Sequence, residues 1–171
     1  MLETIRLRFE PISPKHLGDA ADMFCTNNRV MASTLKGSVF TRSEFDSLLH
    51  TDFINEHEPV FGFWCVILKE SNRFIGVSGI HKIKYQDKEY CEFGFILNDS
   101  HWGQGLATEI GHHWISYATE TLKLDQIIAT VSPHNLASRR VLEKLDMKYM
   151  DQVTSVDRGD RIILGKNLFK H

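Results

Sequence analysis

The sequence predicts one mixed α/β domain of the α+β class, with a central, mostly antiparallel, twisted sheet of about six or seven strands and helices on both faces. Residues 62–97 contain three strand-like runs joined by short polar connections, as in an antiparallel meander. Residues 105–121 have apolar side chains at the spacing of an amphipathic helix, and strand and helix patterns alternate after it. With 171 residues the chain has the size of one domain, and we expect residues 1–171 to form it.

One strand and two helices are predicted in the first third of the chain. Apolar and polar residues alternate over residues 5–9, which is typical of a strand. A helix is expected over residues 14–24, where a proline occupies the first helical position. Residues 26–41 are expected to be irregular. A second helix is predicted over residues 42–57, with Thr41 as its N-cap.

The middle and last parts of the chain supply the remaining elements. The meander consists of predicted strands at residues 62–68, 73–83 and 90–97. In the helix of residues 105–121, Gly111 lies on the buried face and would permit close approach to a sheet. The elements expected after it are a buried strand parallel to its neighbour at residues 127–131, a helix at 136–145, a closing strand at 161–168 and an additional strand near 149–154.

The composition excludes several classes of protein. Twenty Lys and Arg residues against 22 Asp and Glu residues give a net charge of −2, without the strong positive charge of a dedicated nucleic-acid-binding protein. Cys25, Cys65 and Cys91 are far apart and contain no C-x-x-C pair, so neither a disulfide framework nor a zinc knuckle is indicated. No apolar run suggests a signal peptide or approaches the ~18 residues of a membrane span. We expect a cytoplasmic monomer or homodimer with no nucleic-acid or membrane partner.

The segment "EFGFILNDSHWGQGLATE", residues 92–109, carries the chemistry. A strand runs into a loop in which Gly103 and Gly105 remove side chains, and the clearest helix of the chain begins there. The first amides of a helix have no partner within it and lie at the positive end of the helix dipole, which suits a phosphate or pyrophosphate. The alternative is that the two glycines only make a tight turn.

Two familiar phosphate-binding patterns do not fit this loop. A dinucleotide-binding fingerprint needs a small residue where Thr108 stands, and an acidic residue after the next strand, which instead ends in "ATVSPHN". A P-loop needs the sequence G-K-[ST], which is missing from the loop.

Three segments resemble one known family. They are "WGQGLATE" at residues 102–109, "SPHNLASRRVLEKLDMKY" at 132–149 and the opening "ETIRLRFEPIS" at 3–13. They resemble the GNAT family of N-acetyltransferases and, more narrowly, its RimJ/RimL-like branch, which acetylates the N-termini of ribosomal proteins. The family's phosphate motif is Q/R-x-x-G-x-G/A; Trp102 occupies the first position, as is typical of this branch, and Gly105 and Ala107 occupy the small-residue positions.

The resemblance implies acetyl-CoA as the co-substrate, with its pyrophosphate on the amides of residues 103–108. It also implies that the sheet splays at this site and that the strand before the loop bulges, so that free amides of that strand bind the pantetheine arm and the acetyl carbonyl. The alternative for that strand is an ordinary core strand. The residues assigned to acetyl-CoA in this way are Phe95, Ile96, Leu97, Trp102, Gly103, Gln104, Gly105, Leu106, Ala107, Thr108, Asn135 and Ser138.

Glu92 is the candidate catalytic base. Side chains alternate along residues 90–97, which places Glu92 beside Gly94 and Ile96 on one face of an apolar strand. A carboxylate there is unusual unless it has a task or a partner, and a poorly solvated carboxylate is the better proton acceptor. The alternative role is an ion pair with Arg73, Lys82 or Lys84 on an adjacent strand.

Ser138 is the candidate catalytic acid. Many members of the resembled family place a tyrosine, the acid for the departing thiol, where this chain has Leu142; the RimL-like branch instead uses a serine three residues after the asparagine, which is Ser138. The alternative role of Ser138 is to cap the first turn. The resemblance also assigns Asn135 to the pantetheine arm, which is compatible with an N-cap.

Two further expectations concern departures and metals. The family usually ends the helix of residues 136–145 with Gly-Phe, and here Asp146 and Met147 follow it. We expect Asp146 to tolerate the left-handed conformation and the lost aromatic ring to reshape the floor of the acceptor pocket. Glu109 and His113 share a helix face, but no third ligand has a recognisable spacing, so no metal site is expected. His101 and His134 flank the cofactor site.

Three functions remain open at this stage. The first is an active N-acetyltransferase, which the joint presence of Glu92, Asn135 and Ser138 favours. The second is a catalytically silent acyl-CoA-binding module of the same fold, and the third is a generic nucleotide-phosphate binder. The acceptor amine, a peptide α-amine, a polyamine or an amine antibiotic, is expected to contact residues 27–41 and 151–160. The resemblance tilts this choice toward a peptide α-amine.

Overall fold

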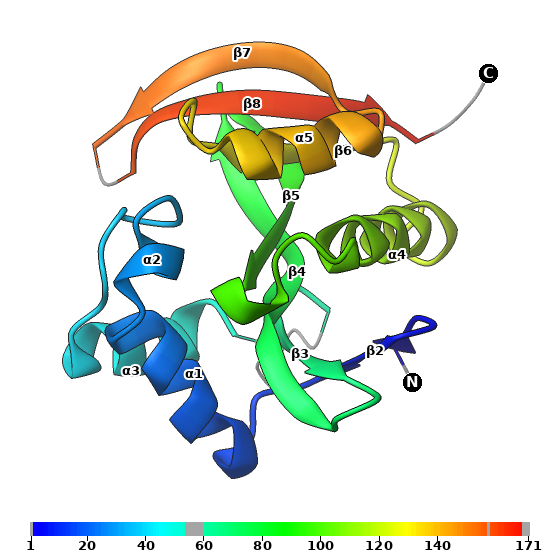
Figure 1. Cartoon of the computed structure of the whole chain (residues 1–171). Helices are drawn as coiled ribbons and strands as arrows, with labels where there is room; N and C mark the ends of the chain where they lie inside the picture. Colours follow the sequence, from blue (N-terminus) through cyan, green and yellow to red (C-terminus); the bar gives the residue numbers. More distant parts are fainter. Residues whose placement is uncertain (1, 54–59, 157, 169–171) are drawn as a thin grey trace.

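The structure is a computed structural model that describes residues 2–53, 60–156 and 158–168. Its described strands form one eight-stranded sheet in the order β1-β2-β3-β4-β5-β6-β8-β7. All neighbouring strands are antiparallel except β5 and β6, which are parallel. The predicted mixed α/β class and the mostly antiparallel sheet are confirmed, with one or two strands more than expected (Figure 1).

The opening strand is shorter than predicted, because the chain turns back within it. β1 (Leu2–Glu3) pairs antiparallel with β2 (Leu7–Glu10). The Thr4 amide donates to the Leu7 carbonyl at 2.8 Å and closes the turn between them. Ile5 lies in this turn and is 93% exposed, so the alternating pattern at residues 5–9 includes one apolar residue that faces solvent.

The segment between β2 and β3 is helical over more of its length than predicted. A 3-10 turn, η1 (Pro14–His16), precedes α1 (Leu17–Cys25), and a short helix, α2 (Asn28–Met31), lies in the region predicted to be irregular. The side chain of Asn27 caps α2 by accepting from the Val30 amide. A side-chain cap of this kind is a local signal for a helix that residue periodicity does not show.

The second predicted helix ends earlier than expected. α3 (Arg42–Thr51) begins at Thr41 as predicted, and Glu44 completes the capping box. It ends at Thr51 because Asp52 and Phe53 pair with the next strand: the Phe63 amide donates to the Asp52 carbonyl at 2.7 Å, and Phe53 bridges Phe63. The rest of this predicted helix, residues 54–57, lies outside the described residues.

The meander occurs where it was predicted. β3 (Gly62–Leu68), β4 (Arg73–Tyr85) and β5 (Lys88–Leu97) pair in succession. β4 and β5 run further toward each other than expected, because only Gln86 and Asp87 connect them. Both residues have positive φ angles, 47° and 61°, as a two-residue hairpin turn of the favoured hand requires.

The second half alternates between helix and strand as predicted. After the 3-10 turn η2 (Asp99–His101), the chain forms α4 (Leu106–Glu120), β6 (Gln126–Val131), α5 (Leu136–Lys144), β7 (Lys148–Ser155) and β8 (Gly159–Asn167). The additional strand expected near residues 149–154 is therefore present as β7. Among the described residues, no helix is both long and apolar enough to cross a membrane.

Helices cover both faces of the sheet, as predicted. α1, α2 and α3 pack on one face around the buried rings of Phe24, Phe45 and Phe53. α4 and α5 pack on the other face, where Trp114 is fully buried (Figure 1). Gly111 permits close approach to the side chain of Leu145 at the end of α5, and not to the sheet as predicted, because a Cβ atom there would overlap that side chain.

The sheet opens between its two parallel strands. β5 and β6 pair at one position, Glu92 with Ile128, and beyond it residues of both strands line a cavity. The bulge expected in β5 is not seen on its β4 side, where the pairing is unbroken from Gly76–Leu97 to Tyr85–Lys88. The opening therefore arises from the divergence of β6, whose chain turns into α5 after Val131.

Candidate functional site

Two cavities meet where the sheet opens. The larger, of about 360 Å³, lies between the end of β5, the start of α4 and α5. The smaller, of about 90 Å³, lies between β5 and β6 and reaches the β7–β8 turn. Five residues line both, namely Ser33, Thr34, Phe95, Asn135 and Ser138. A molecule in each cavity would therefore meet the other at these five residues.

The larger cavity gathers all the residues that the sequence assigned to acetyl-CoA. It is lined by Phe95, Ile96, Leu97, Trp102, Gly103, Gln104, Gly105, Leu106, Ala107, Thr108, Asn135 and Ser138. It also contains two exposed cations on α5, Arg140 and Lys144, which the sequence analysis missed. They lie four residues apart on one side of α5, a spacing that could have identified them as a pair.

The start of α4 presents free backbone amides to this cavity. The first amide that donates within the helix is that of Glu109, to the Gly105 carbonyl at 3.1 Å, so the amides of Leu106, Ala107 and Thr108 precede the helical ladder. Gly103 and Gly105 have φ angles of 73° and 75°. Only glycine adopts this left-handed conformation readily, so the glycines set the path of the backbone into the helix.

Three side-chain contacts hold this loop. The Trp102 indole N–H donates to the Leu97 carbonyl at 2.8 Å and ties the loop to the end of β5. The Gln104 side chain donates to the Ser100 carbonyl at 3.1 Å. Arg6 donates to the Gln104 carbonyl at 2.9 Å and joins the loop to the chain just before β2. The loop is thus supported from both of its ends.

Arg6 and Glu109 add a charge pair beneath the loop. Their side chains meet at 2.6 Å, and Glu109 also accepts from the Thr4 hydroxyl. Burial alone would raise the pKa of Glu109, but the hydrogen bonds from Thr4 and Arg6 outweigh it and hold the pKa below its usual value. Glu109 therefore stays ionised and paired at neutral pH. Its negative charge also interacts favourably with the positive end of the α4 dipole.

The amides of β5 alternate between its two neighbours. The Asn98 amide donates to the Ile75 carbonyl of β4 at 2.9 Å. In an antiparallel pair every second amide points to the same neighbour, so the Ile96 amide also faces β4. The amides of Phe95 and Leu97 then point to the opening left by β6. The sequence assigned three amides of β5 to the pantetheine arm and the acetyl carbonyl. Those of Phe95 and Leu97 face the cavity, whereas Ile96 lines the cavity but its amide faces β4.

Asn135 and Ser138 occupy the junction of the two cavities. The Asn135 carboxamide oxygen accepts from the Ser138 amide at 3.1 Å, which confirms Asn135 as the N-cap of α5. The Asn135 amide nitrogen also donates to the Ser33 carbonyl at 3.4 Å. Ser138 is capped and does not cap: within the described part of the chain, its hydroxyl makes no hydrogen bond.

Glu92 lines the smaller cavity and is 8% exposed. One carboxylate oxygen accepts from the Thr130 hydroxyl on β6, and the other lies 3.9 Å from the Arg158 guanidinium, which belongs to the β7–β8 turn. The ion pair considered from the sequence, with Arg73, Lys82 or Lys84, is not formed: Lys84 pairs with Asp87, and Lys82 lies over the ring of Phe61. Glu92 thus has polar neighbours, but they come from β6 and the β7–β8 turn and not from β4.

Two arginines of the smaller cavity were missed by the sequence analysis. Arg158 and Arg161 flank Glu92, and Arg161 donates to the Leu35 carbonyl at 2.6 Å. Both lie within or beside the segment 151–160 that was expected near the acceptor, and Ser33, Thr34 and Leu35 represent the expected segment 27–41. The sequence pattern does not distinguish these arginines from ordinary surface charges, because a strand that faces solvent also carries charged residues at alternate positions.

The end of α5 behaves partly as expected. Asp146 has a φ angle of 59°, so it adopts the left-handed conformation in place of the family's glycine. Lys166 donates to the preceding Leu145 carbonyl at 2.7 Å and holds this helix end. Met147 is buried in the core beneath α4 and α5 and lines neither cavity, so it does not form the floor of an acceptor pocket. Leu142 of α5 lines the smaller cavity instead.

The histidines are dispersed. Of the two histidines that flank the cofactor site in the sequence, His101 lines the larger cavity, whereas His134 is exposed and lines neither cavity. His113 is stacked on Phe9 at 4.5 Å between ring centroids, and burial lowers its pKa. Within residues 2–53, 60–156 and 158–168, no three His, Cys, Asp or Glu side chains gather as metal ligands.

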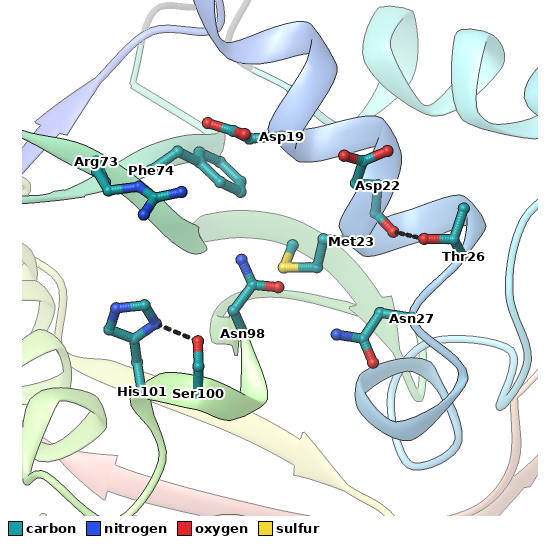
Figure 2. A pocket seen from close by; sticks show the side chains of 10 residues that line it. All are labelled: Asp19, Asp22, Met23, Thr26, Asn27, Arg73, Phe74, Asn98, Ser100 and His101. Atoms are coloured by element: carbon teal, nitrogen blue, oxygen red, sulfur yellow. Dashed lines mark hydrogen bonds between the residues drawn. The ribbon is translucent and has the colours of Figure 1, made fainter.

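A third cavity, of about 320 Å³, lies between α1, the start of β4 and η2. Figure 2 shows Asp19 and Asp22 on its α1 side opposite His101, which hydrogen-bonds Ser100 at 2.9 Å. Arg73 also lines it, so its charges are mixed. His101 is its connection to the larger cavity.

Comparison with known proteins adds to this geometry. A family model described as an acetyltransferase (GNAT) domain matches residues 6–148. The chain is 35% identical over 83 residues to an uncharacterised N-acetyltransferase p20 of Bacillus licheniformis, covering 48% of this chain and 46% of that protein. It is 32% identical over 111 residues to the probable N-acetyltransferase YjcK of Bacillus subtilis, covering 65% and 58%. The chain spans about half the length of the curated relatives it matches.

Solved structures share the whole fold. A GNAT-family acetyltransferase from Bacillus anthracis superimposes with a TM-score of 0.79 at 23% identity and 98% coverage of both chains. RimL, a ribosomal-protein α-N-acetyltransferase in complex with coenzyme A, gives 0.78 at 13% identity, with 96% of each chain covered. Spermidine N-acetyltransferase from Vibrio cholerae, in complex with CoA and spermine, gives 0.76 at 16% identity, with 96% and 97% covered. At these identities the likeness is one of fold.

Proposed function

Since the chain belongs to the acetyltransferase (GNAT) family, we propose that it transfers an acetyl group from acetyl-CoA to a primary amine by direct attack in a ternary complex. The observation that carries this proposal is the meeting of two cavities at the opened sheet. One cavity has the free amides that suit a phosphorylated carrier, and the other has a buried carboxylate. A direct transfer requires this adjacency, because both molecules must be bound at once.

The larger cavity would hold acetyl-CoA. The amides of Leu106, Ala107 and Thr108 would receive the pyrophosphate, and Arg140 and Lys144 add positive charge at the same cavity. The amides of Phe95 and Leu97 face the opening and would bind the arm that leads to the thioester. These residues fit the molecule in charge and in the kind of hydrogen-bonding group that they present.

The smaller cavity would hold the acceptor amine. The amine nitrogen attacks the thioester carbonyl carbon, the carbon–sulfur bond breaks, and the nitrogen loses a proton. Glu92 would take that proton, directly or through a water molecule, and the thiolate would take one from Ser138, whose hydroxyl is uncommitted within the described residues. Glu92 would then release its proton to solvent and Ser138 would regain one from solvent, which restores both groups. Leu142 has no proton to give and would only shape the wall.

The finer part of the proposal concerns the acceptor. We favour the α-amine of a peptide, because three segments of the chain resemble the RimJ/RimL-like branch. Structures with this fold include both RimL and a spermidine acetyltransferase, so the fold alone leaves the choice of amine to the side chains of the acceptor cavity.

A release assay tests the proposal. Purified protein is incubated with acetyl-CoA and a panel of peptides, polyamines and amine antibiotics, and free thiol is measured. We expect thiol release that depends on one class of amine. In parallel, acetyl-CoA, NAD and ATP are compared by thermal shift, and we expect acetyl-CoA alone to raise the melting temperature. Stabilisation by acetyl-CoA without thiol release for any amine would indicate an acyl-CoA-binding module instead.

A further inference from the structure

The smaller cavity contains both cationic and anionic side chains. Among the described residues that line it, Glu92 contributes a carboxylate, Arg158 and Arg161 contribute guanidinium groups, and the others are uncharged. An arginine remains protonated at any physiological pH, so both side chains present a cation to this cavity. Two cations that line one cavity attract a ligand group of the opposite charge.

Arg161 is built into the cavity and is not a surface side chain that happens to reach it. Arg161 is 8% exposed and is fixed by its bond to the Leu35 carbonyl at 2.6 Å. Burial lowers the pKa of Arg161, and repulsion by Arg158 lowers it further, while Glu92 opposes both effects. Both guanidiniums line the same cavity, where an anion between them would relieve the repulsion of their like charges.

The spacing of the charges suggests what the anion belongs to. A carboxylate oxygen of Glu92 lies 3.9 Å from a guanidinium nitrogen of Arg158. An ammonium group bound beside Glu92 would thus lie only a few bond lengths from the Arg158 guanidinium. The ligand that complements a close carboxylate and guanidinium is a close ammonium and carboxylate, since each charge then meets its opposite. The hydroxyl groups of Ser33, Thr34 and Ser132 line the same cavity and add further donors.

We propose that the acceptor is a primary amine with a carboxylate a few bonds from its nitrogen, held by Glu92 at the ammonium end and by Arg158 and Arg161 at the carboxylate end. This inference rests on the proposed acetyltransferase activity and narrows its acceptor. A polyamine would place a second ammonium group against the guanidiniums, and this like-charge contact rejects it. A free amino acid and a peptide with an acidic first residue share the required chemistry.

Matched acceptors test this inference with the full-length protein. The value of kcat/KM is measured by thiol release for three sets: alanine against alaninamide, a peptide that begins with aspartate against the same peptide beginning with asparagine, and spermidine alone. We expect the anionic member of at least one pair to exceed its neutral partner by about tenfold or more, and spermidine to be the poorest acceptor. The first pair identifies a free amino acid as the source of the carboxylate, and the second identifies a peptide.

Variants of Arg158 then assign the preference to this residue, which is more exposed than Arg161 and easier to replace without unfolding the protein. Arg158→Gln should reduce the ratio of anionic to neutral acceptor toward one while the affinity for acetyl-CoA is retained, and Arg158→Lys should restore part of the ratio. Arg42→Gln is the matched control, because Arg42 lies on α3 and pairs with Asp46 outside both cavities.

Three results would overturn the inference. They are a higher kcat/KM for spermidine or for the neutral partners, a ratio that Arg158→Gln leaves unchanged, and an equal loss of the ratio in Arg42→Gln. Each of these leaves acetyl transfer itself standing. By contrast, thiol release with none of the acceptors would overturn the proposed function, and with it this narrower inference.

Discussion

The two cavities that meet at the opened sheet differ in what they present to a ligand. The larger presents mainly backbone amides, from the end of β5 and the start of α4. The smaller presents charged side chains from β5, β8 and the β7–β8 turn. Backbone amides are present whatever the side chains are, whereas a charge disappears with a single substitution. The comparison suggests that glycine backbone geometry controls binding of the carrier, and that three side-chain charges control choice and activation of the acceptor.

The largest expected effect comes from removing the negative charge of Glu92 in the smaller cavity. Glu92→Gln keeps the shape of the side chain and loses the proton acceptor, so kcat should fall by about 10²–10⁴-fold while acetyl-CoA affinity is unchanged. Stopped thiol-release assays and isothermal calorimetry measure the two quantities. An acceptor whose amine is already deprotonated at neutral pH is the control, and with it the variant and the natural protein should be nearly equal. A uniform loss for both acceptors would make Glu92 a structural partner of Thr130 and Arg158.

The converse test changes the backbone of the larger cavity. Gly105→Val places a β-branched residue at a φ angle of 75°, where L-residues are strained by about 1–2 kcal/mol. The amides at the start of α4 should then shift, and acetyl-CoA affinity should fall at least about tenfold, an amount that corresponds to ~1.4 kcal/mol. Gly159→Val, at a φ angle of 65° at the start of β8, carries similar strain and should leave acetyl-CoA affinity intact. Equal losses in both variants would refute this assignment.

A methyl group added at Gly94 tests whether the two cavities bind separate molecules. A Cβ atom at Gly94 would have no atom within 4 Å, so Gly94→Ala should fold normally and intrude only on the smaller cavity. One methyl group in a binding pocket is worth about 1–3 kcal/mol, so kcat/KM for the acceptor should fall by about tenfold or more, with acetyl-CoA affinity retained. Steady-state kinetics with either substrate varied distinguishes these outcomes. A rise in the KM for acetyl-CoA alone would contradict the separation.

Asn135 lies where the cavities join and should show a mixed effect. Asn135→Ala removes the cap on the Ser138 amide and should cost about 1 kcal/mol of unfolding free energy. It should also raise the KM for acetyl-CoA more than it lowers kcat, because contacts to the carrier arm are made equally in the ground and transition states. Chemical denaturation and kinetics check the two parts. Lost stability with unchanged KM would reduce Asn135 to a helix cap.

The smallest expected effect comes from a charge outside both cavities. A hydrogen bond from Lys15 lowers the pKa of Glu10 to about 2, against the opposing effect of burial and with help from Arg8. The unfolded value is near ~4.3, so this stabilisation is present above that pH and is lost as the pH falls toward 2. Glu10→Gln should therefore lose about 1 kcal/mol or less at pH 7, and the difference from the natural protein should vanish near pH 2. Denaturation curves at several pH values test this, with acetyl transfer unchanged at neutral pH.

The same contrast explains how far the sequence could predict the site. The amides of the larger cavity come from continuous segments, residues 95–97 and 102–108, so one stretch of glycines and a helix pattern identified most of it. The smaller cavity is assembled from residues 33–35, β3, β5, β6, α5, β8 and the β7–β8 turn. Its members become neighbours only through strand order, and β8 lies between β6 and β7, an order that no local pattern specifies.

The secondary structure could likewise be predicted where it depends on a local pattern. Elements whose burial repeats regularly, such as α4 and the β3–β5 meander, were predicted nearly to the residue. Errors occurred where a single contact overrode the pattern. The turn closed by Thr4 and Leu7 splits the first strand, and pairing of Phe53 with Phe63 ends α3. Contacts of this kind depend on the tertiary arrangement and leave no periodic trace in the chain.

The divergence of β5 and β6 also bears on aggregation. Unpaired strand edges usually template pairing with other chains, which is why exposed edges are hazardous. Here β5 and β6 each have an unpaired stretch in the interior of the sheet, and α5 and residues 33–34 stand over the gap between them. A foreign strand would have to displace these elements before it could reach the free amides of Phe95 and Leu97. The protein thus keeps unpaired backbone amides at the centre of its sheet, where a slender ligand can reach them and another polypeptide strand cannot.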